Sequence, residues 1–582
     1  MLKNFLAILL ILLLCQPIFV FAQTKRKISL LLTGGKIFTA DAGFSVAEAV
    51  AVDGEKIVAV GKTSELKAKY QATREIDLQG KLVTPGFNDA HVHFLRGALA
   101  LLTVNLLDAK SLEEAKARVA AKAKEVKSGE WIFGRGWDHT VWKQNFPSRK
   151  DLDAVAPNNP VYLVRVDGHV AWVNSAALKL AGIDRGTPNP EGGEIEKDAQ
   201  GEPTGILKET AQGLVARLIP QPDQPTLFKG LETALDMARR YGITSVQDNS
   251  GYETTKLYRA FLQQDKLTVR VSEWQDFEDS IEKLKAQRTE FASFKDNPAR
   301  LKLGALKGYV DGTLGSKTAA MLAPFSDDAG NSGIPRRPPE ELTRMMVERA
   351  KEDFQIALHA IGDRANRMAL EGFAAIQKEP QIAIHTTPVR SSDGGVSWDS
   401  TYLPRRKNAR HRIEHAQVVS PADFKRFAEL GIIASMQPSH AISDKRWAES
   451  RLGEYRVLGA YAWHLMKSYQ VHVPFGTDFP VEPINPYNTL YAAVSRQDAE
   501  GDPIGGWQPQ ERLTMAEAIR CHTFESAYAE FSEKEKGEIK TGMLADLVVH
   551  SKDLLTIEPK EILTTEAVLT IFNGRVVYEK KN

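Results

Sequence analysis

The segment Thr84–His93 carries two histidines, His91 and His93, two residues apart, just after an apolar run that ends in Pro-Gly. In a β-strand, residues i and i+2 point to the same side of the sheet. Both imidazoles can therefore aim a nitrogen at one divalent metal ion at the end of a strand. A His-x-His pair is weak support by itself, so its meaning depends on residues further along the chain.

Four more side chains capable of metal or acid–base chemistry follow apolar segments with the pattern of strands. They are Lys307, His359, His415 and Asp478. In a closed barrel of parallel strands, the carboxyl ends all face one mouth, where active sites form. We therefore expect these side chains to converge on a metal together with the His-x-His pair.

Each residue also has a structural interpretation. His359 can be a core histidine with satisfied hydrogen bonds, and Lys307 can form an ordinary salt bridge. Asp478 can cap a helix, because Asp is a good N-cap and a proline follows closely. Glu414 can be a metal ligand or a structural partner, and we favour the partner. The metal interpretation is preferred because the structural interpretations would all have to be true at once, at successive strand ends.

The middle of the chain alternates between helix and strand patterns. Residues 112–123 have high helix propensity, and a strand at 243–248 follows a helix at 226–241. The alternation predicts a parallel sheet covered by helices, and the number of units favours a closed eight-unit barrel. Further strand candidates are residues 301–310, 355–360, 411–417, 432–436 and 471–476.

The barrel region, residues 83–530, is much longer than the ~250 residues typical of such a barrel. We therefore predict an insertion at about 104–205 and a hydrophilic loop at about 386–406. Both chain ends have short alternating apolar runs with turn signals such as Asp53-Gly54 and Asn573-Gly574. They predict one small β domain formed from residues 23–82 and 531–582.

The first 22 residues differ in composition from the rest. Lys3 is the one charge, an apolar run extends to Phe21, and a polar chain begins at Gln23. This pattern predicts a cleaved secretory signal, with an uncleaved membrane anchor as the alternative. After cleavage Cys521 is the one thiol left, so no internal disulfide can form, which fits a bacterial periplasm.

The charge balance bears on the partners. The 75 lysines and arginines nearly cancel the 74 aspartates and glutamates, so no basic field indicates nucleic-acid binding. We expect a small-molecule substrate, no nucleic acid, and no stable membrane partner after signal cleavage. Monomer and homo-oligomer both stay open.

The chain resembles the amidohydrolase superfamily of metal-dependent hydrolases, and more narrowly the branch that contains N-substituted formamide deformylase. The resemblance runs from residue 31 to residue 577, and its most specific motif is Pro85–His93. Branch-level matches lie at residues 136–138 (GWD), 167–169 (DGH), 311–316 (DGTLGS), 359–363 (HAIGD) and 412–417 (RIEHAQ).

The resemblance implies an α/β fold, a (β/α)8 TIM-type barrel with a small β-sandwich domain formed from both chain ends. It implies that His91 and His93 bind the more buried metal, and that Asp478 contacts this metal and the hydrolytic water. His359 and His415 would bind a second metal. Whether one or two ions are bound stays open.

Lys307 occupies the position at which many superfamily members carry a carboxylated lysine. A neutral amine adds carbon dioxide to become an anionic carbamate that can bridge two cations, whereas an ammonium has no lone pair. A divalent ion lowers the pKa of bound water from 15.7 toward about 7. Asp478 would then take the water's proton and pass it to the leaving nitrogen. Zinc is the first choice, with manganese or iron as alternatives.

Residues that recognise the substrate are less well specified. Trp137, Asp138 and His169 lie in the predicted insertion and can line the barrel mouth. Arg364 can bind an anionic group, although a structural role at a helix start is equally compatible with its position. We assign structural roles to His440 and His472.

The sequence therefore predicts a secreted or periplasmic metallohydrolase that cleaves a non-peptide C–N bond, formamide-like or N-acyl. A second enzyme hypothesis keeps the metal site but changes the bond to a lactone, ester or carbamate. A third is a catalytically silent periplasmic binding or regulatory protein on the same scaffold, because fold does not guarantee activity. The complete set of predicted ligands favours an enzyme.

Overall fold

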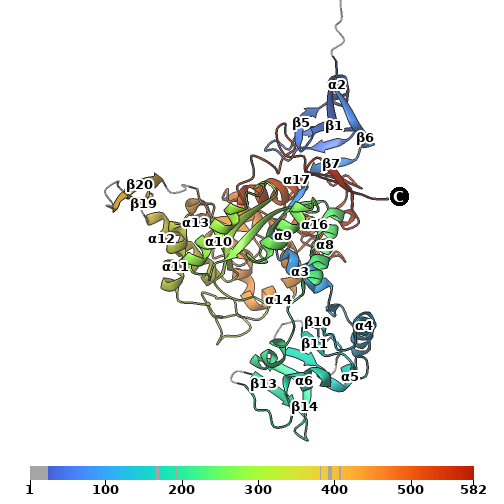
Figure 1. Cartoon of the computed structure of the whole chain (residues 1–582), viewed down its shortest axis with the longest axis vertical. Coiled ribbons are helices and arrows are strands. Elements are labelled where there is room, and N and C mark those ends of the chain that lie inside the picture. The colour runs from blue at the N-terminus through green and yellow to red at the C-terminus, as the bar shows by residue number, and fades with distance from the viewer. Residues whose placement is uncertain are drawn as a thin grey trace, which may run out of the picture.

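The structure, a computed structural model, describes residues 24–139, 141–143, 145–165, 170–190, 193–379, 382–390, 396–404 and 408–581. It shows a β-rich part near the chain ends, a central α/β barrel, and a separate α/β part formed by residues that follow α3 (Figure 1). The predicted signal segment at 1–22 lies outside the described residues. Within them, no helix combines the length and the apolar character needed to cross a bilayer.

Seven parallel strands form the central sheet, in the order β22-β21-β18-β17-β16-β15-β8. All residues of β8, β15 and β18 are buried, as expected for strands covered on both faces. The strands are β8 (Phe87–Val92), β15 (Ile243–Asp248), β16 (Arg270–Asp276), β17 (Leu301–Tyr309), β18 (Ile356–Ala360), β21 (Arg412–His415) and β22 (Ile433–Ser435).

Residues 471–476 bridge the gap between β22 and β8. The Ala434 amide donates to the His472 carbonyl, and the Ala90 amide donates to the Phe475 carbonyl, each at 3.0 Å. The sheet is therefore a nearly closed parallel barrel, which confirms the predicted α/β class. The segment itself is paired by these bonds without forming a regular strand.

Helices follow the strands and cover the outside of the barrel. In α8, residues Leu231, Ala234, Leu235 and Ala238 are buried at helical spacing, and Asp223 caps the first turn. The helices are α3 (Phe94–Leu101), α8 (Gln224–Arg240), α9 (Thr254–Gln263), α10 (Ile281–Ser293), α11 (Pro339–Lys351), α12 (Asp363–Lys378), α13 (Phe424–Leu430), α14 (Pro438–Arg456), α15 (Trp463–Ser468), α16 (Pro486–Ser495), α17 (Met515–Arg520) and α18 (Ser526–Ala529).

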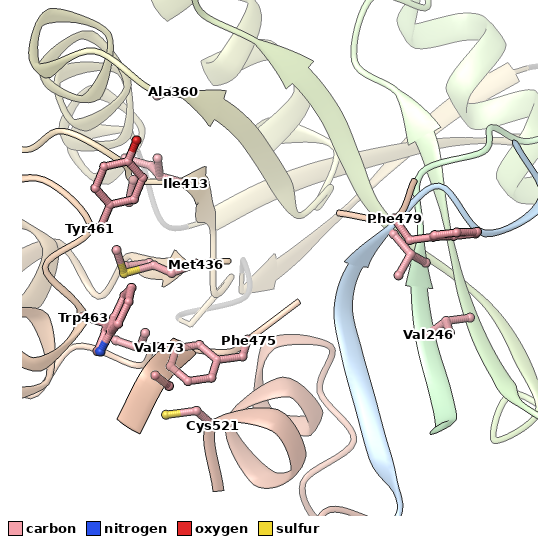
Figure 2. Close-up of a cluster of buried hydrophobic side chains, with 14 of the residues drawn as sticks. Val246, Ala360, Ile413, Met436, Tyr461, Trp463, Val473, Phe475, Phe479 and Cys521 are labelled. Carbon is pink, nitrogen blue, oxygen red and sulfur yellow. The ribbon is translucent and has the colours of Figure 1, made fainter. Parts of the chain in front are cut away.

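A buried apolar cluster packs behind the segment that closes the barrel. Figure 2 shows Met436, Trp463 and Phe475 in this cluster, with Cys521 beside them. Burial raises the pKa of the Cys521 thiol to about 12. The thiol is therefore uncharged at neutral pH and serves as core packing rather than as a nucleophile.

The β-rich part joins strands from both chain ends. Strand β7 pairs antiparallel with β23, within a six-stranded sheet of order β25-β24-β23-β7-β2-β3. A four-stranded sheet, β5-β4-β1-β6, shares a hydrophobic core with it. The strands are β1 (Arg26–Thr33), β2 (Lys36–Phe38), β3 (Val46–Ala47), β4 (Ala49–Asp53), β5 (Lys56–Gly61), β6 (Tyr70–Asp77), β7 (Leu82–Pro85), β23 (Leu547–His550), β24 (Ala567–Phe572) and β25 (Arg575–Glu579), and α2 (Thr63–Lys69) follows β5.

The part that follows α3 has a six-stranded sheet of its own, in the order β13-β14-β12-β11-β10-β9, with its own hydrophobic clusters. Figure 1 shows it apart from the β-rich ends, on the α3 and α14 side of the barrel. Its elements are β9 (Val104–Asn105), α4 (Leu112–Glu125), β10 (Ile132–Trp137), α5 (Arg149–Asp153), β11 (Val161–Arg165), β12 (Val170–Val173), α6 (Ser175–Ala181), β13 (Gly193–Lys197), β14 (Pro203–Glu209) and α7 (Gly213–Ala216).

The hydrophilic loop predicted at about 386–406 contains strand structure instead. Strand β19 (Ile382–Arg390) pairs antiparallel with β20 (Val396–Pro404) along its full length. Hairpin pairing satisfies the backbone groups that an extended loop would leave to water, and polarity alone does not reveal it.

His550 joins the β-rich part to the barrel's helices. Its Nε2 lies 3.0 Å from the Thr84 hydroxyl on β7, and its Nδ1 lies 2.9 Å from the Tyr487 hydroxyl on α16. The ring is fully buried, and this burial lowers the pKa of His550 to about 3.

This low pKa predicts an acid sensitivity that His550→Gln reduces. An unfolded histidine titrates near pH 6.5, whereas His550 in the folded protein titrates near 3. Between these two pH values, residue 550 binds a proton in the unfolded chain but not in the folded one, so the free energy of unfolding decreases as the pH is lowered. From pH 7.5 to 5.5, we expect the wild-type free energy of unfolding to drop by about 1.4 kcal/mol more than that of the variant. Urea denaturation at both pH values measures this, and parallel pH profiles would contradict it.

Candidate metal centre

Three of the predicted ligands meet at the carboxyl ends of the barrel strands. His91 lies on β8, His415 ends β21, and Asp478 follows the closing segment 471–476. One ligand atom from each lies within 4.8 Å of the others. The Asp478 amide donates to the His91 carbonyl at 2.7 Å, which fixes the aspartate beside the first strand. The barrel therefore brings three ligand atoms close enough together to bind one metal ion.

His93 faces the same aspartate as His91. The Nε2 atoms of His91 and His93 lie 3.4 and 3.3 Å from Asp478 Oδ1. The Nδ1 of His93 donates to the Asn249 carbonyl at 3.1 Å, which leaves a lone pair on its Nε2. Both residues of the His-x-His pair thus point to one oxygen, as their spacing predicted.

His359 lies beside His415 but is not one of the three residues whose ligand atoms lie within 4.8 Å of one another. Its ring centroid is 4.6 Å from that of His415. However, its Nε2 donates to the Gly312 carbonyl at 2.9 Å, in the loop after β17. Burial lowers the pKa of His359 to about 3, so the ring is neutral and its Nδ1 has the lone pair. Its role as a ligand to a second metal stays a prediction.

Lys307, on β17, reaches into the centre of the site. Its Nζ lies 3.2 Å from His91 Nε2 and 4.9 Å from the centre of the Tyr309 ring. Burial lowers the pKa of Lys307 to about 8, although Glu414 and Asp478 oppose the shift. A fraction of the amine is therefore neutral near pH 7, which carbamate formation requires. Carboxylation itself stays a prediction.

A buried charge network inside the barrel holds His91. The Glu414 carboxylate accepts a hydrogen bond of 2.6 Å from His91 Nδ1 and is also bonded to the Arg412 guanidinium. Arg412 donates in addition to the Gln247 side chain at 2.5 Å and to the Ser435 hydroxyl at 2.7 Å. Glu414 is thus a partner of a ligand, as favoured from the sequence. Arg412 was missed, although its i, i+2 spacing from Glu414 places both on the inner face of β21.

These contacts determine which ring nitrogens can bind a metal. His415 Nδ1 donates to Gln437 Oε1 at 2.8 Å, so His91 and His415 both keep a lone pair on Nε2. Burial lowers the pKa of His91 to about 4 and holds that of His415 well below its ordinary value. Both rings are neutral at pH 7. Two neutral imidazoles and a carboxylate fit a divalent cation such as Zn²⁺, Mn²⁺ or Fe²⁺.

Glu414→Gln tests this orientation. The amide can no longer act as a charged acceptor for His91 Nδ1, so we expect metal affinity to fall about 10–100-fold. Competition with a chromogenic chelator measures the affinity, and circular dichroism checks the fold. Glu500→Gln, at an exposed glutamate, is the matched control. Unchanged affinity in Glu414→Gln would show that the network does not orient the ligand.

Asp89 ties the first strand to the closing segment. Its Oδ1 accepts from the Thr477 and His91 amides at 3.0 and 3.2 Å, and its Oδ2 accepts from the Thr477 hydroxyl at 2.6 Å. Burial raises the pKa of this carboxyl to about 7. Glycine is also required at position 476, because a Cβ there would lie 2.6 Å from the backbone nitrogen of His91. This junction places Asp478 against His91.

The residues predicted to bind the substrate have local partners within the described part of the chain. Trp137 is fully buried in the core of the α/β part after α3, where its Nε1 donates to the Leu163 carbonyl at 2.9 Å. A role for Trp137 in substrate binding stays a prediction. Asp138 forms a 2.8 Å ion pair with Arg165 in that part. Arg364 is exposed in the first turn of α12, and His169 lies outside the described residues.

His440 is a site residue that the sequence analysis missed. It lies in the first turn of α14, and its Nε2 is 3.7 Å from Asp478 Oδ2. The signal was its position, four residues after the strand candidate at 432–436. His472 differs, because its Nδ1 lies 2.5 Å from Glu525 and its ring stacks on Tyr528 at 3.7 Å, away from the metal ligands.

Comparisons with known proteins agree with this geometry. Residues 74–578 match the family model described as "Amidohydrolase family". The chain is 32% identical to a putative amidohydrolase, YtcJ, of Bacillus subtilis (strain 168), over 94% of this chain and 99% of that protein. It is 27% identical to the N-substituted formamide deformylase of Arthrobacter pascens, over 95% and 98% of the two chains.

Among solved structures, an uncharacterized metal-dependent hydrolase from Pyrococcus horikoshii OT3 superposes with a TM-score of 0.73 at 26% identity. The match covers 91% of this chain and 99% of that one. The family model spans most of the sequence, and the His-x-His strand and the strand-end ligands lie inside the matched range. The chain belongs to the amidohydrolase family.

Proposed function

We propose that this protein hydrolyses a non-peptide C–N bond, of the formamide or N-acyl amide class, with a divalent metal. The observation that carries the proposal is the convergence of His91, His415 and Asp478, with Nδ1 of each imidazole hydrogen-bonded so that Nε2 keeps the lone pair. The relative named N-substituted formamide deformylase supports the choice of bond. Hydrolysis of a lactone, ester or carbamate on the same site is the second candidate.

The donor set indicates how a metal would be held. Because one ligand atom of His415 lies within 4.8 Å of those of His91 and Asp478, we assign His415 to the first ion instead of the second. His91, His93, His415 and Asp478 would hold this first ion, and Zn²⁺ is our first choice because imidazole-rich sites suit it. We propose that His359 and a carboxylated Lys307 would contribute to a second ion. When bound, a divalent ion supplies Lewis acidity that brings the pKa of a coordinated water toward about 7 and polarises a carbonyl.

Side chains of the protein would transfer the proton of the attacking water. Asp478 would accept the proton of the attacking water while the new C–O bond forms, and would return it to the nitrogen as the C–N bond breaks. Burial lowers the pKa of His91 and of His415 below the ordinary histidine value, so these two rings are neutral at pH 7 and do not compete for this proton. Glu414 and Arg412 keep His91 in its ligand orientation throughout.

We also propose a setting for this activity. The signal-like first 22 residues and the single thiol of the mature chain support a secreted or periplasmic enzyme that acts on a small molecule. For the fold, we infer that segment 471–476 is the eighth barrel position of a (β/α)8 architecture. We infer that the two sheets at the chain ends form a β-sandwich, because they share one core.

A substrate panel tests the proposal. Purified protein with added Zn²⁺ is assayed for amine release from N-substituted formamides and N-acyl amides, alongside matched lactones, esters and carbamates. We expect amide turnover that His91→Ala abolishes. Turnover restricted to lactones, esters or carbamates would favour the second candidate. Full metal loading without any turnover would favour the catalytically silent binding protein.

A further inference from the structure

The side chain of His440 has a buried ring nitrogen with no hydrogen-bond partner. Strand β22 ends at Ser435, and His440 follows it in the first turn of α14, so the ring lies at the same barrel mouth as the metal ligands. Its side chain is 12% exposed, and its Nε2 is buried without a partner. At 3.7 Å, the nearby Asp478 Oδ2 is too far for a hydrogen bond.

The position of this ring relative to the ligands is well defined. Its centroid is 5.8 Å from that of His415, with the planes 21° apart. Asp478 directs Oδ1 to His91 and His93, and it is the other oxygen, Oδ2, that His440 approaches. His440 therefore flanks the proposed proton acceptor on the side not used by the His-x-His pair.

A second unpartnered donor comes from the same turn. Gln437, the residue that precedes α14, accepts from His415 Nδ1 through Oε1, but its buried Nε2 has no partner. Burying a polar group without a hydrogen bond is unfavourable, so such groups usually have a ligand or water as partner. Two such buried nitrogens in one turn, each from a residue close to a predicted metal ligand, offer a place for an acceptor atom.

We propose that His440 is a catalytic residue whose Nε2–H donates a hydrogen bond to the oxygen of the scissile carbonyl. This inference rests on the proposed amide hydrolysis. As the water oxygen bonds to the carbonyl carbon, the π electrons move onto the carbonyl oxygen, and a donor placed there stabilises the developing charge. When the C=O bond re-forms, the C–N bond breaks and the nitrogen takes the proton held by Asp478. Gln437 positions His415 and contributes the second donor of the turn.

The test compares His440→Phe, which removes the donor, with His440→Gln, which keeps a side-chain N–H. His472→Gln is the control, because His472 pairs with Glu525 away from the ligands. We expect kcat of His440→Phe to fall about 10²–10³-fold at nearly unchanged KM and metal content. His440→Gln should recover part of the loss, and the control should match the wild type.

A tetrahedral inhibitor distinguishes stabilisation of the oxyanion from a packing role. For N-benzyl methylphosphonamidate, whose oxygens mimic the oxyanion, we expect the inhibition constant of His440→Phe to rise by the factor by which kcat/KM falls. A kcat within threefold of wild type, or loss of the metal from His440→Phe, would overturn the assignment. If the wild type hydrolyses no amide, the proposed function fails separately. Equal phosphonamidate affinity of wild type and His440→Phe, measured by calorimetry, would then overturn the His440 proposal as well.

Discussion

Removal of the divalent metal is expected to lower the hydrolysis rate by at least about 10³-fold, because Lewis-acid activation contributes several kcal/mol to the barrier. Without the ion, the site offers neutral imidazoles and a carboxylate, and none of these activates a water strongly at pH 7. Dialysis against dipicolinate followed by elemental analysis and a rate assay measures the effect. Added Zn²⁺ or Mn²⁺ should restore the rate, and undiminished activity in metal-free protein would contradict the proposed mechanism.

Elemental analysis also decides the role of Lys307. If its side chain bridges two ions as a carbamate, Lys307→Ala should reduce the metal content from two ions per chain to one. Lys302→Ala is a suitable control, because Lys302 pairs with Glu530, away from the ligands. An unchanged metal content in Lys307→Ala would remove this lysine from the metal site and leave it as a buried neighbour of His91.

Asp478→Asn is expected to lower kcat by about 10²–10⁴-fold, the usual contribution of a positioned proton acceptor. The amide has nearly the same size and keeps one oxygen, so packing against His91 and His93 is preserved. It cannot take up the water's proton. Steady-state kinetics and metal analysis on the same preparation separate lost proton transfer from lost metal.

The control for this variant is Asp265→Asn, which removes an exposed ion pair with Arg575. The control should retain wild-type kcat. A near-wild-type kcat in Asp478→Asn with full metal content would show that another group accepts the proton. A variant that loses both metal and activity would identify Asp478 first as a ligand.

Much of the site could be predicted because a parallel barrel converts sequence order into position. Every strand ends at the same mouth, so a polar residue at the end of an apolar run is placed there whatever lies between the strands. This reasoning placed His91, His415 and Asp478 together, and the structure brings them within one ligand-sized group. For Glu414 the sequence left a metal ligand and a structural partner open and favoured the partner, and its carboxylate accepts a hydrogen bond from His91.

His440 and the predicted substrate residue Trp137 lie outside this strand-end pattern. His440 is in a helix, and its contact with Asp478 depends on how the closing segment meets β22, which no local pattern records. Trp137 is in the α/β part after α3, where an aromatic residue suits a core and a binding surface equally well. Which of the two it joins depends on tertiary packing, and here the ring enters the core.

The junction of β8 with segment 471–476 has a consequence for durability. The barrel has its first and last parallel elements side by side there, and His91 and Asp478 lie one on each side. An ion bound by both residues would act as a removable cross-link between β8 and segment 471–476, where the barrel closes. Binding to the native state alone stabilises a protein, so chelation should make the chain unfold faster and expose it sooner to proteolysis.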